Sequence, residues 1–138
     1  MRQGETVFVD SGAWIALALS RDPLHEPARE QWELLHGAGA KLHTSIPVVL
    51  ETFTFLDRNA NRDVALMWRE SIYAHGSVKV LACELRDLDQ SWEYFRRADL
   101  HKLSAVDATS FAIMKRARIR VAYTFDHHFA VVGFRLVA

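Results

Sequence analysis

The stretch Leu103–Met114, LSAVDATSFAIM, combines the start of a helix with an acid in an unexpected place. Ser104, followed three residues later by Asp107, has the pattern of a capping box at a helix N-terminus. Leu103 and Phe111 lie four residues to either side of Asp107, so its carboxylate leans toward the apolar face of the predicted helix. Burying a lone charge is costly, and Asp107 therefore needs partners from elsewhere in the chain.

The composition is typical of one globular domain. The chain has 138 residues, 50% of them hydrophobic and 25% charged, so we expect a single domain over residues 1–138. Its 17 basic and 17 acidic residues give a net charge of zero, which argues against binding nucleic acid through bulk positive charge. The single cysteine, Cys83, excludes an internal disulfide and a cysteine-rich zinc site. Without a signal-peptide pattern or a long apolar run, we expect a cytoplasmic protein with no membrane span.

Short strands alternate with helices along the chain, which indicates an α/β fold. The expected strands are Thr6–Val9, Lys41–Thr44, Val78–Leu81, Arg120–Phe125 and an edge strand, Gly133–Val137. The expected helices are Ala13–Leu19, Pro27–Gly37, Val48–Asp57, Arg62–His75, Asp87–Ala98 and one from the opening stretch to about Arg118. This alternation predicts a mostly parallel central sheet of about four to five strands, flanked by helices on both faces.

Four acids are expected to meet at one edge of this sheet. Asp10 and Asp126 directly follow two of the strands, while Glu51 and Asp107 lie in the opening turns of two helices. The C-terminal ends of parallel strands share one edge, and functional sites of such sheets form there. Because the four positions are far apart in the sequence, only the fold can bring them together.

Each acid also has an ordinary structural explanation. Asp10 and Asp126 could form turns or cap helices. Glu51 could be a first-turn acid favoured by the helix dipole, and Asp107 could complete its capping box. These explanations weaken together, because neither Glu51 nor Asp107 has a basic residue at helical spacing. A site for a hard divalent ion accounts for all four acids, since the ion relieves their mutual repulsion and suits phosphodiester hydrolysis.

Four segments together resemble the PIN-domain family. They read VFVDSGAW, PVVLETF, LSAVDATSFAIM and YTFDHHFAVVGFRLV, and they extend over essentially the whole chain. The chain is most similar to the VapC-like toxins of bacterial and archaeal toxin–antitoxin pairs. The resemblance implies a ribonuclease dependent on Mg²⁺ or Mn²⁺, with an RNA substrate, a silencing antitoxin and a homodimeric assembly. It places the catalytic and metal-binding roles on Asp10, Glu51, Asp107 and Asp126.

The resemblance also implies three supporting residues. Ser11 and Thr124 stand where the family often has a small hydroxyl beside the site, and Asp99 stands where similar sequences tend to carry an acid. Two further features stay outside this pattern. Adjacent histidines at 127–128 cannot face the same way, so at most one points at the site, and a surface or helix N-terminal position is favoured. The basic stretch Lys115–Arg120 is interpreted as a solvated helix end rather than an RNA contact.

Most of the large aromatic residues are expected to be buried. The four tryptophans and Phe53, Phe55, Phe95 and Phe111 are expected in the core, with some of those on the first two helices available for a dimer or antitoxin surface. Receiver domains and haloacid-dehalogenase-like phosphatases share the fold class, but the D-S-G after the first strand lacks their doubled acid or D-x-D. A PIN-fold RNA-processing nuclease and a non-catalytic RNA- or protein-binding module stay open as alternatives.

Overall fold

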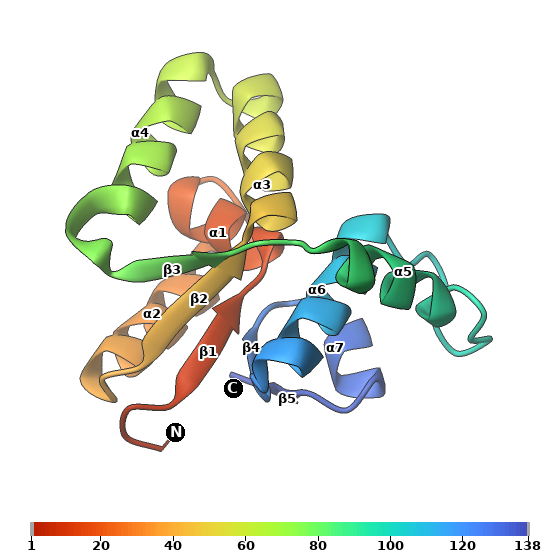
Figure 1. The fold of residues 1–138 in the computed structure, drawn as a ribbon. Helices are drawn as coiled ribbons and strands as arrows, with labels where there is room; N and C mark the ends of the chain where they lie inside the picture. Colours follow the sequence, from red (N-terminus) through yellow and green to blue (C-terminus); the bar gives the residue numbers. More distant parts are fainter. Residues whose placement is uncertain (1, 138) are drawn as a thin grey trace.

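One parallel sheet forms the centre of the protein in the computed structural model, which describes residues 2–137 (Figure 1). Its strands, in the spatial order β3-β2-β1-β4-β5, are β1 (Thr6–Val9), β2 (Lys41–Ser45), β3 (Val78–Leu81), β4 (Val121–Tyr123) and β5 (Arg135–Leu136). Each neighbouring pair is parallel, so the predicted sheet is confirmed. The last two strands are shorter than predicted, and Gly133, at φ 106°, belongs to the turn before β5.

Helices lie on both faces of the sheet, as predicted. They are α1 (Ser11–Ala18), α2 (His25–Gly37), α3 (Ile46–Asn59), α4 (Arg62–Tyr73), the 3₁₀ turn η1 (Ala74–Gly76), α5 (Leu85–Tyr94), α6 (Ala105–Ala117) and α7 (His128–Val131). The chain moves outward from β1 to β3 and then returns to β4 on the other side of β1. Because parallel crossovers are right-handed, this reversal puts the later helices on the opposite face, as α2 and α6 show in Figure 1. Among the described residues, no helix combines the length and apolar character that crossing a bilayer requires.

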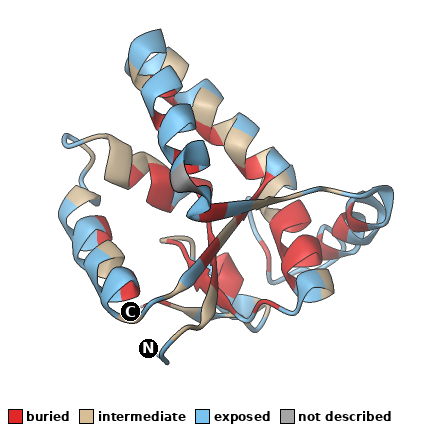
Figure 2. Ribbon diagram, turned by 60° about the vertical axis from the view of Figure 1, so that its left-hand side comes forward, coloured by how far each residue is buried: buried red, intermediate tan, exposed pale blue. Residues whose placement is uncertain are grey.

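The core is densest around β1 and α6. Val7, Phe8 and Val9 of β1 are fully buried, as expected for a central strand covered on both faces. Every residue of α6 from Ala108 to Met114 is buried as well, and these segments account for much of the red in Figure 2. A helix that is buried all round has little freedom to shift, so its N-terminus is a rigid support for the acid at Asp107.

Helix α5 faces the opposite way from the prediction. Trp92 and Phe95 are expected in the core, but they are 48% and 46% exposed, and Leu88 on the same stripe is 36% exposed. Phe55 of α3 is likewise exposed, whereas Phe111 is buried as predicted. Helical spacing identifies an apolar stripe correctly but does not say what covers it, and within this chain the stripe of α5 is left uncovered.

A buried ion pair explains the orientation of α5. Asp87 is buried and accepts hydrogen bonds from Nε and Nη2 of Arg116 on α6, at 2.8 and 2.9 Å. Asp87 also accepts a hydrogen bond from the backbone N–H of Glu84, the N-cap of α5. The helix therefore begins at Leu85, two residues earlier than predicted. Because a buried charge needs its partner, this ion pair turns the polar side of α5 inward and leaves the apolar side in solvent.

Candidate active site

The strand order reverses between β1 and β4, and the candidate site lies where these two strands end. The backbone N–H of Asp10 donates to the carbonyl of Tyr123 at 3.0 Å, so the two strand ends are held side by side. In parallel α/β sheets, ligands bind at the carboxyl edge next to such a reversal. The positions that follow the two strands, Asp10 and Thr124, are therefore neighbours.

Asp10 has one satisfied and one unsatisfied oxygen. Its Oδ2 accepts a hydrogen bond from Thr124 Oγ1 at 2.8 Å, while its Oδ1 is buried with no partner among the described residues. Asp10 occupies the N-cap position of α1, yet its side chain makes no capping hydrogen bond. The helix-cap explanation of Asp10 is therefore wrong. A buried carboxylate oxygen without a partner is a group that a cation would satisfy.

Glu51 reaches the site from α3 and is held by α1. Ser11 Oγ donates to Glu51 Oε1 at 2.5 Å, which links the first residue of α1 to the carboxylate. Because α3 begins at Ile46, Glu51 lies in the second turn and not in the opening turn predicted for it. Helix-dipole stabilisation acts mainly within the first turn, so it does not explain this acid.

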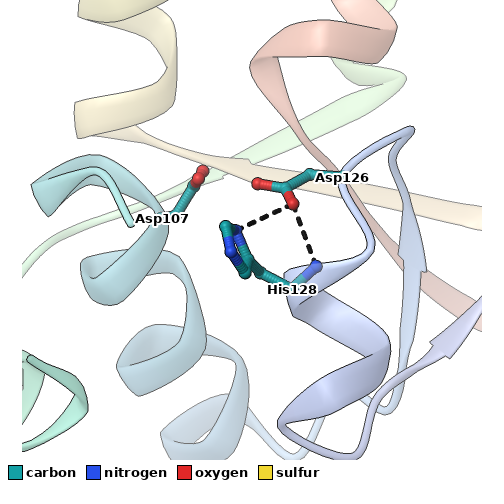
Figure 3. A group of neighbouring side chains, drawn as sticks. All are labelled: Asp107, Asp126 and His128. Atoms are coloured by element: carbon teal, nitrogen blue, oxygen red, sulfur yellow. Dashed lines mark hydrogen bonds and ion pairs between the residues drawn. The ribbon is translucent and has the colours of Figure 1, made fainter. Parts of the chain in front are cut away.

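Asp107 forms only half of the predicted capping box. Its backbone N–H donates to Ser104 Oγ at 3.0 Å, so Ser104 caps α6 as expected. The carboxylate of Asp107 is not used to close the box; it lies beside Asp126 and His128 (Figure 3). The acid on the apolar face of the helix is therefore at the site, where its partners are other acids.

Asp126 and His128 complete the cluster from the turn after β4. The backbone N–H of Asp126 donates to Thr124 Oγ1 at 3.0 Å, and Asp126 Oδ1 accepts the N–H of His128 at 2.9 Å. The turn-forming explanation of Asp126 thus holds for one of its oxygens. One ligand atom from each of Asp107, Asp126 and His128 lies within 4.8 Å of the others (Figure 3).

The two adjacent histidines lie side by side, with ring centroids 4.7 Å apart and Nδ1 atoms 4.0 and 2.9 Å from Oδ1 of Asp126, so the prediction that they face different ways is wrong. The side chain of His127 is 82% exposed, whereas that of His128 is 10% exposed. His127 precedes α7 and His128 begins it, so the predicted helix N-terminal position holds for both, whereas the surface alternative fits only His127. Sequence reasoning missed His128 because the usable signal is indirect: Phe129, which follows it, is fully buried and draws the preceding side chain inward.

An aromatic contact fixes the cluster on both sides. The rings of Phe111 and Phe129 meet edge to face, with centroids 4.8 Å apart and planes at 84°. Phe111 lies one helical turn after Asp107, and Phe129 directly follows His128. Edge-to-face pairs of buried rings are favourable and geometrically specific. The contact therefore sets the position of Asp107 relative to His128.

The negative charges of neighbouring acids make ionisation of Asp10 and Asp107 less favourable. Burial, together with the neighbouring carboxylates, raises the pKa of Asp10 to about 6. Burial and the charges of the other three acids also raise the pKa of Asp107. For Asp126, burial acts in the same direction, but hydrogen bonding with Asp107 and the contacts of His128 outweigh it, and its pKa is lowered. The cluster thus holds protons that a divalent cation would displace.

Two other predicted features, Asp99 and the basic stretch, are engaged in ion pairs of their own. Asp99 accepts hydrogen bonds from Arg97 at 2.9 and 2.7 Å, and this pair lowers the pKa of Asp99. A supporting role for Asp99 stays a prediction. The basic stretch Lys115–Arg120 starts at the end of α6 opposite Asp107, roughly 12 Å or more along the helix. Its Arg116 is engaged with Asp87, so this stretch is a helix end far from the acids.

Comparisons with known proteins agree with this architecture. The PIN domain family matches residues 7–135. The chain is 34% identical over 128 residues to the 23S rRNA-specific endonuclease VapC20 of Mycobacterium tuberculosis, covering 93% of this chain and 95% of the relative. A crystal structure of that VapC20, described as a Sarcin-Ricin loop cleaving toxin, superposes with a TM-score of 0.80 at 33% identity over 93% and 95% of the two chains. VapBC2 from Rickettsia felis, bound to a DNA fragment from their promoter, shares the fold with a TM-score of 0.71 at 9% identity, covering 95% of this chain and 96% of the other.

Proposed function

Because the chain belongs to the PIN domain family, we propose that it is a metal-dependent endoribonuclease and the toxin of a toxin–antitoxin pair. The observation that carries the proposal is the convergence of four acids at the carboxyl edge of the sheet, with one buried oxygen of Asp10 left without a partner among the described residues. We propose Mg²⁺ or Mn²⁺ as the metal. One nuclease domain over residues 1–138 and a cytoplasmic location belong to the same proposal.

The donor set fits a hard divalent cation. Carboxylate oxygens are the ligands that Mg²⁺ and Mn²⁺ prefer, and the proposed holders are Asp10, Glu51, Asp107 and Asp126. When bound, such an ion supplies positive charge that activates a water and stabilises the leaving oxygen of a phosphodiester. The chain itself orients the acids, since Ser11 holds Glu51 and Thr124 holds Asp10. This bound charge also reconciles an RNA substrate with a protein of zero net charge.

RNA cleavage with and without metal tests the proposal. We expect Mn²⁺ to support cleavage of an RNA oligonucleotide, and EDTA or Asp10→Asn to abolish it, because both remove the charge balance of the site. The relative is named for 23S rRNA and its Sarcin-Ricin loop, so an oligonucleotide of that loop is the first substrate, beside a scrambled RNA. Asp63→Asn, an exposed acid on α4, is the matched control.

Cleavage that survives chelation or Asp10→Asn would contradict the metal-nuclease assignment. The toxin role has a separate test, because a toxin expressed without its antitoxin is expected to arrest growth. Unimpaired growth on expression of the active wild-type protein would reject the toxin role and leave an RNA-processing nuclease. Absence of cleavage on every RNA tried, with normal metal binding, would favour the non-catalytic binding module.

Thr124 provides a test of how the acids are held. Its Oγ1 donates to Asp10 and accepts from the backbone of Asp126, so Thr124→Val removes both contacts with little change in volume. We expect Mn²⁺ affinity to fall by about 10-fold or more, the usual effect of losing a residue that orients a ligand. Isothermal titration calorimetry measures this change. Thr109→Val, which loses only a hydroxyl bonded to the backbone of Val106, is expected to keep wild-type affinity.

A homodimer is proposed to cover the exposed stripe of α5, which consists of Leu85, Leu88, Trp92 and Phe95. These side chains are 74%, 36%, 48% and 46% exposed and lie at helical spacing, and contiguous apolar surface of this kind marks an interaction site. We expect Trp92→Glu to convert a dimer into a monomer in light scattering, because it buries a charge in the interface. Glu93→Gln, on the same helix but off the stripe, is the control. A wild-type monomer at high concentration would reject this dimer.

The antitoxin is proposed to bind elsewhere, over the tryptophans of the first two helices. Trp14 and Trp32 line a cavity of about 530 Å³ together with Met67 and Trp68 of α4. The ring centroid of Trp14 lies 6.0 Å from that of Trp32 and 5.9 Å from that of Trp68. Met67 is 69% exposed, so the rim of this cavity is open to an apolar side chain of a partner. Large aromatic residues lining a pocket are typical anchors of protein interfaces.

A further inference from the structure

Two imidazoles approach Asp126 in the acid cluster, and His128 is the buried and nearer one. Its side chain is 10% exposed, its buried Nδ1 lies at ion-pair distance from Asp126, and one of its ring nitrogens lies within 4.8 Å of ligand atoms of both Asp107 and Asp126. We propose that Nδ1 of His128 is a direct metal ligand, which adds a nitrogen donor to the carboxylates and shifts the preference of the site from Mg²⁺ toward Mn²⁺. This inference rests on the proposed metal-dependent function and adds the residue that selects the metal.

Nδ1 of His128 and Oδ1 of Asp126 are spaced like two neighbouring ligands of one metal ion. Nδ1 of His128 lies 2.9 Å from Oδ1 of Asp126, at ion-pair distance (Figure 3), although the contact lacks the angles of a hydrogen bond. The same Oδ1 already accepts the backbone N–H of His128 at 2.9 Å. Adjacent ligands of an octahedral ion at about 2.1 Å lie about 3 Å apart. The two atoms are therefore spaced as ligands that would hold one cation, and a carboxylate oxygen of Asp107 lies within 4.8 Å of a ligand atom of each residue.

The ring is held in this place before any metal arrives. Phe129 anchors the next position of the chain against Phe111 of α6. The exposed ring of His127 packs against that of His128, with centroids 4.7 Å apart and planes at 32°. A ligand whose rotamer is locked by packing loses little entropy on binding, so the nitrogen donor is preorganised.

A nitrogen donor is expected to increase the affinity of the site for Mn²⁺ more than its affinity for Mg²⁺. Imidazole nitrogen binds transition metals more readily than it binds Mg²⁺, which prefers oxygen ligands and retains its waters. Four carboxylates alone would serve either ion. Replacing one oxygen position by Nδ1 of His128 therefore strengthens Mn²⁺ binding relative to Mg²⁺ binding.

Three variants separate a ligand from a residue that only supports the site. His128→Phe keeps a ring but has no donor, and His128→Asn places an amide where Nδ1 stands and offers oxygen instead of nitrogen. His36→Asn changes an exposed imidazole of α2 and is the control. Electron paramagnetic resonance of the Mn²⁺-loaded protein detects ¹⁴N coupling from a bound imidazole, and calorimetry measures Mn²⁺ and Mg²⁺ affinities. Circular dichroism and Tm establish that each variant is folded.

We expect ¹⁴N coupling in the wild type and in His36→Asn, and its loss in both His128 variants. The ratio of Mn²⁺ to Mg²⁺ affinity should fall about 10-fold in His128→Asn, the scale at which a change in the metal's surroundings alters affinity. Wild-type Mn²⁺ binding without ¹⁴N coupling, or equal losses for both ions, would overturn the ligand role and leave the metal-dependent function intact. Failure of the wild type to bind Mn²⁺ at all would overturn both.

Discussion

Asp107→Asn is expected to abolish RNA cleavage and, at the same time, to stabilise the metal-free protein. Asparagine keeps the shape of the side chain but removes the ionisable carboxyl group. The pKa of that carboxyl group is raised by burial and by three neighbouring acids. Cleavage should fall by more than about 100-fold, the loss already caused by removing a residue that only orients a metal ligand. The free energy of unfolding at neutral pH should rise by on the order of 2 kcal/mol, because folding no longer requires the carboxyl to take up a proton.

Thermal unfolding in EDTA and an RNA cleavage assay measure the two effects on the same samples. Asp63→Asn, which removes an exposed acid of α4, should change neither quantity appreciably. A metal-free Asp107→Asn protein that is less stable than the wild type would show that the carboxylate is a structural element. Opposite signs for stability and activity are typical of a site where like charges are held together for function.

The metal-free protein is expected to lose stability as pH rises, and a divalent cation is expected to restore it. The pKa of Asp10 is about 6 in the folded protein and 3.8 as a reference for the unfolded chain. Between these values the folded protein binds a proton that the unfolded chain has released, so the free energy of unfolding falls with increasing pH. Asp107, whose pKa is also raised, extends the loss to higher pH. Asp126 has a lowered pKa and acts with the opposite sign, in the acid range below 3.8.

Tm measured in EDTA and in Mn²⁺ at several pH values checks this expectation. Mn²⁺ binds the ionised carboxylates, so its gain in Tm should be larger near pH 8 than near pH 5. The Asp107→Asn variant should show a flatter pH dependence in EDTA and little response to Mn²⁺. A gain in Tm that is equal at both pH values would mean that the metal does not compete with protons at these acids.

Much of the fold and the four acids of the proposed site could be predicted from local patterns. Apolar runs such as Thr6–Val9, each followed by a helix, determine a parallel sheet, since parallel strands need a crossover between them. Asp10 and Asp126 follow two of these strands, so topology alone directs both to the carboxyl edge. Glu51 and Asp107 could be recognised because neither has a basic neighbour at helical spacing. These inferences use only neighbours in sequence and the rules of chain connection.

The orientation of α5 and the contacts of His128 depend on the tertiary structure. The apolar stripe of α5, which includes Trp92, predicted burial, but the Asp87–Arg116 pair turned it outward. His128 became part of the site because Phe129 packs on Phe111, a contact between positions 18 residues apart in sequence. Periodicity reports which side of an element is apolar, whereas long-range packing and buried ion pairs determine what that side meets. Local patterns therefore account for the sheet and for the placement of the four predicted acids at its carboxyl edge, whereas the imidazole of His128 reached them through long-range packing.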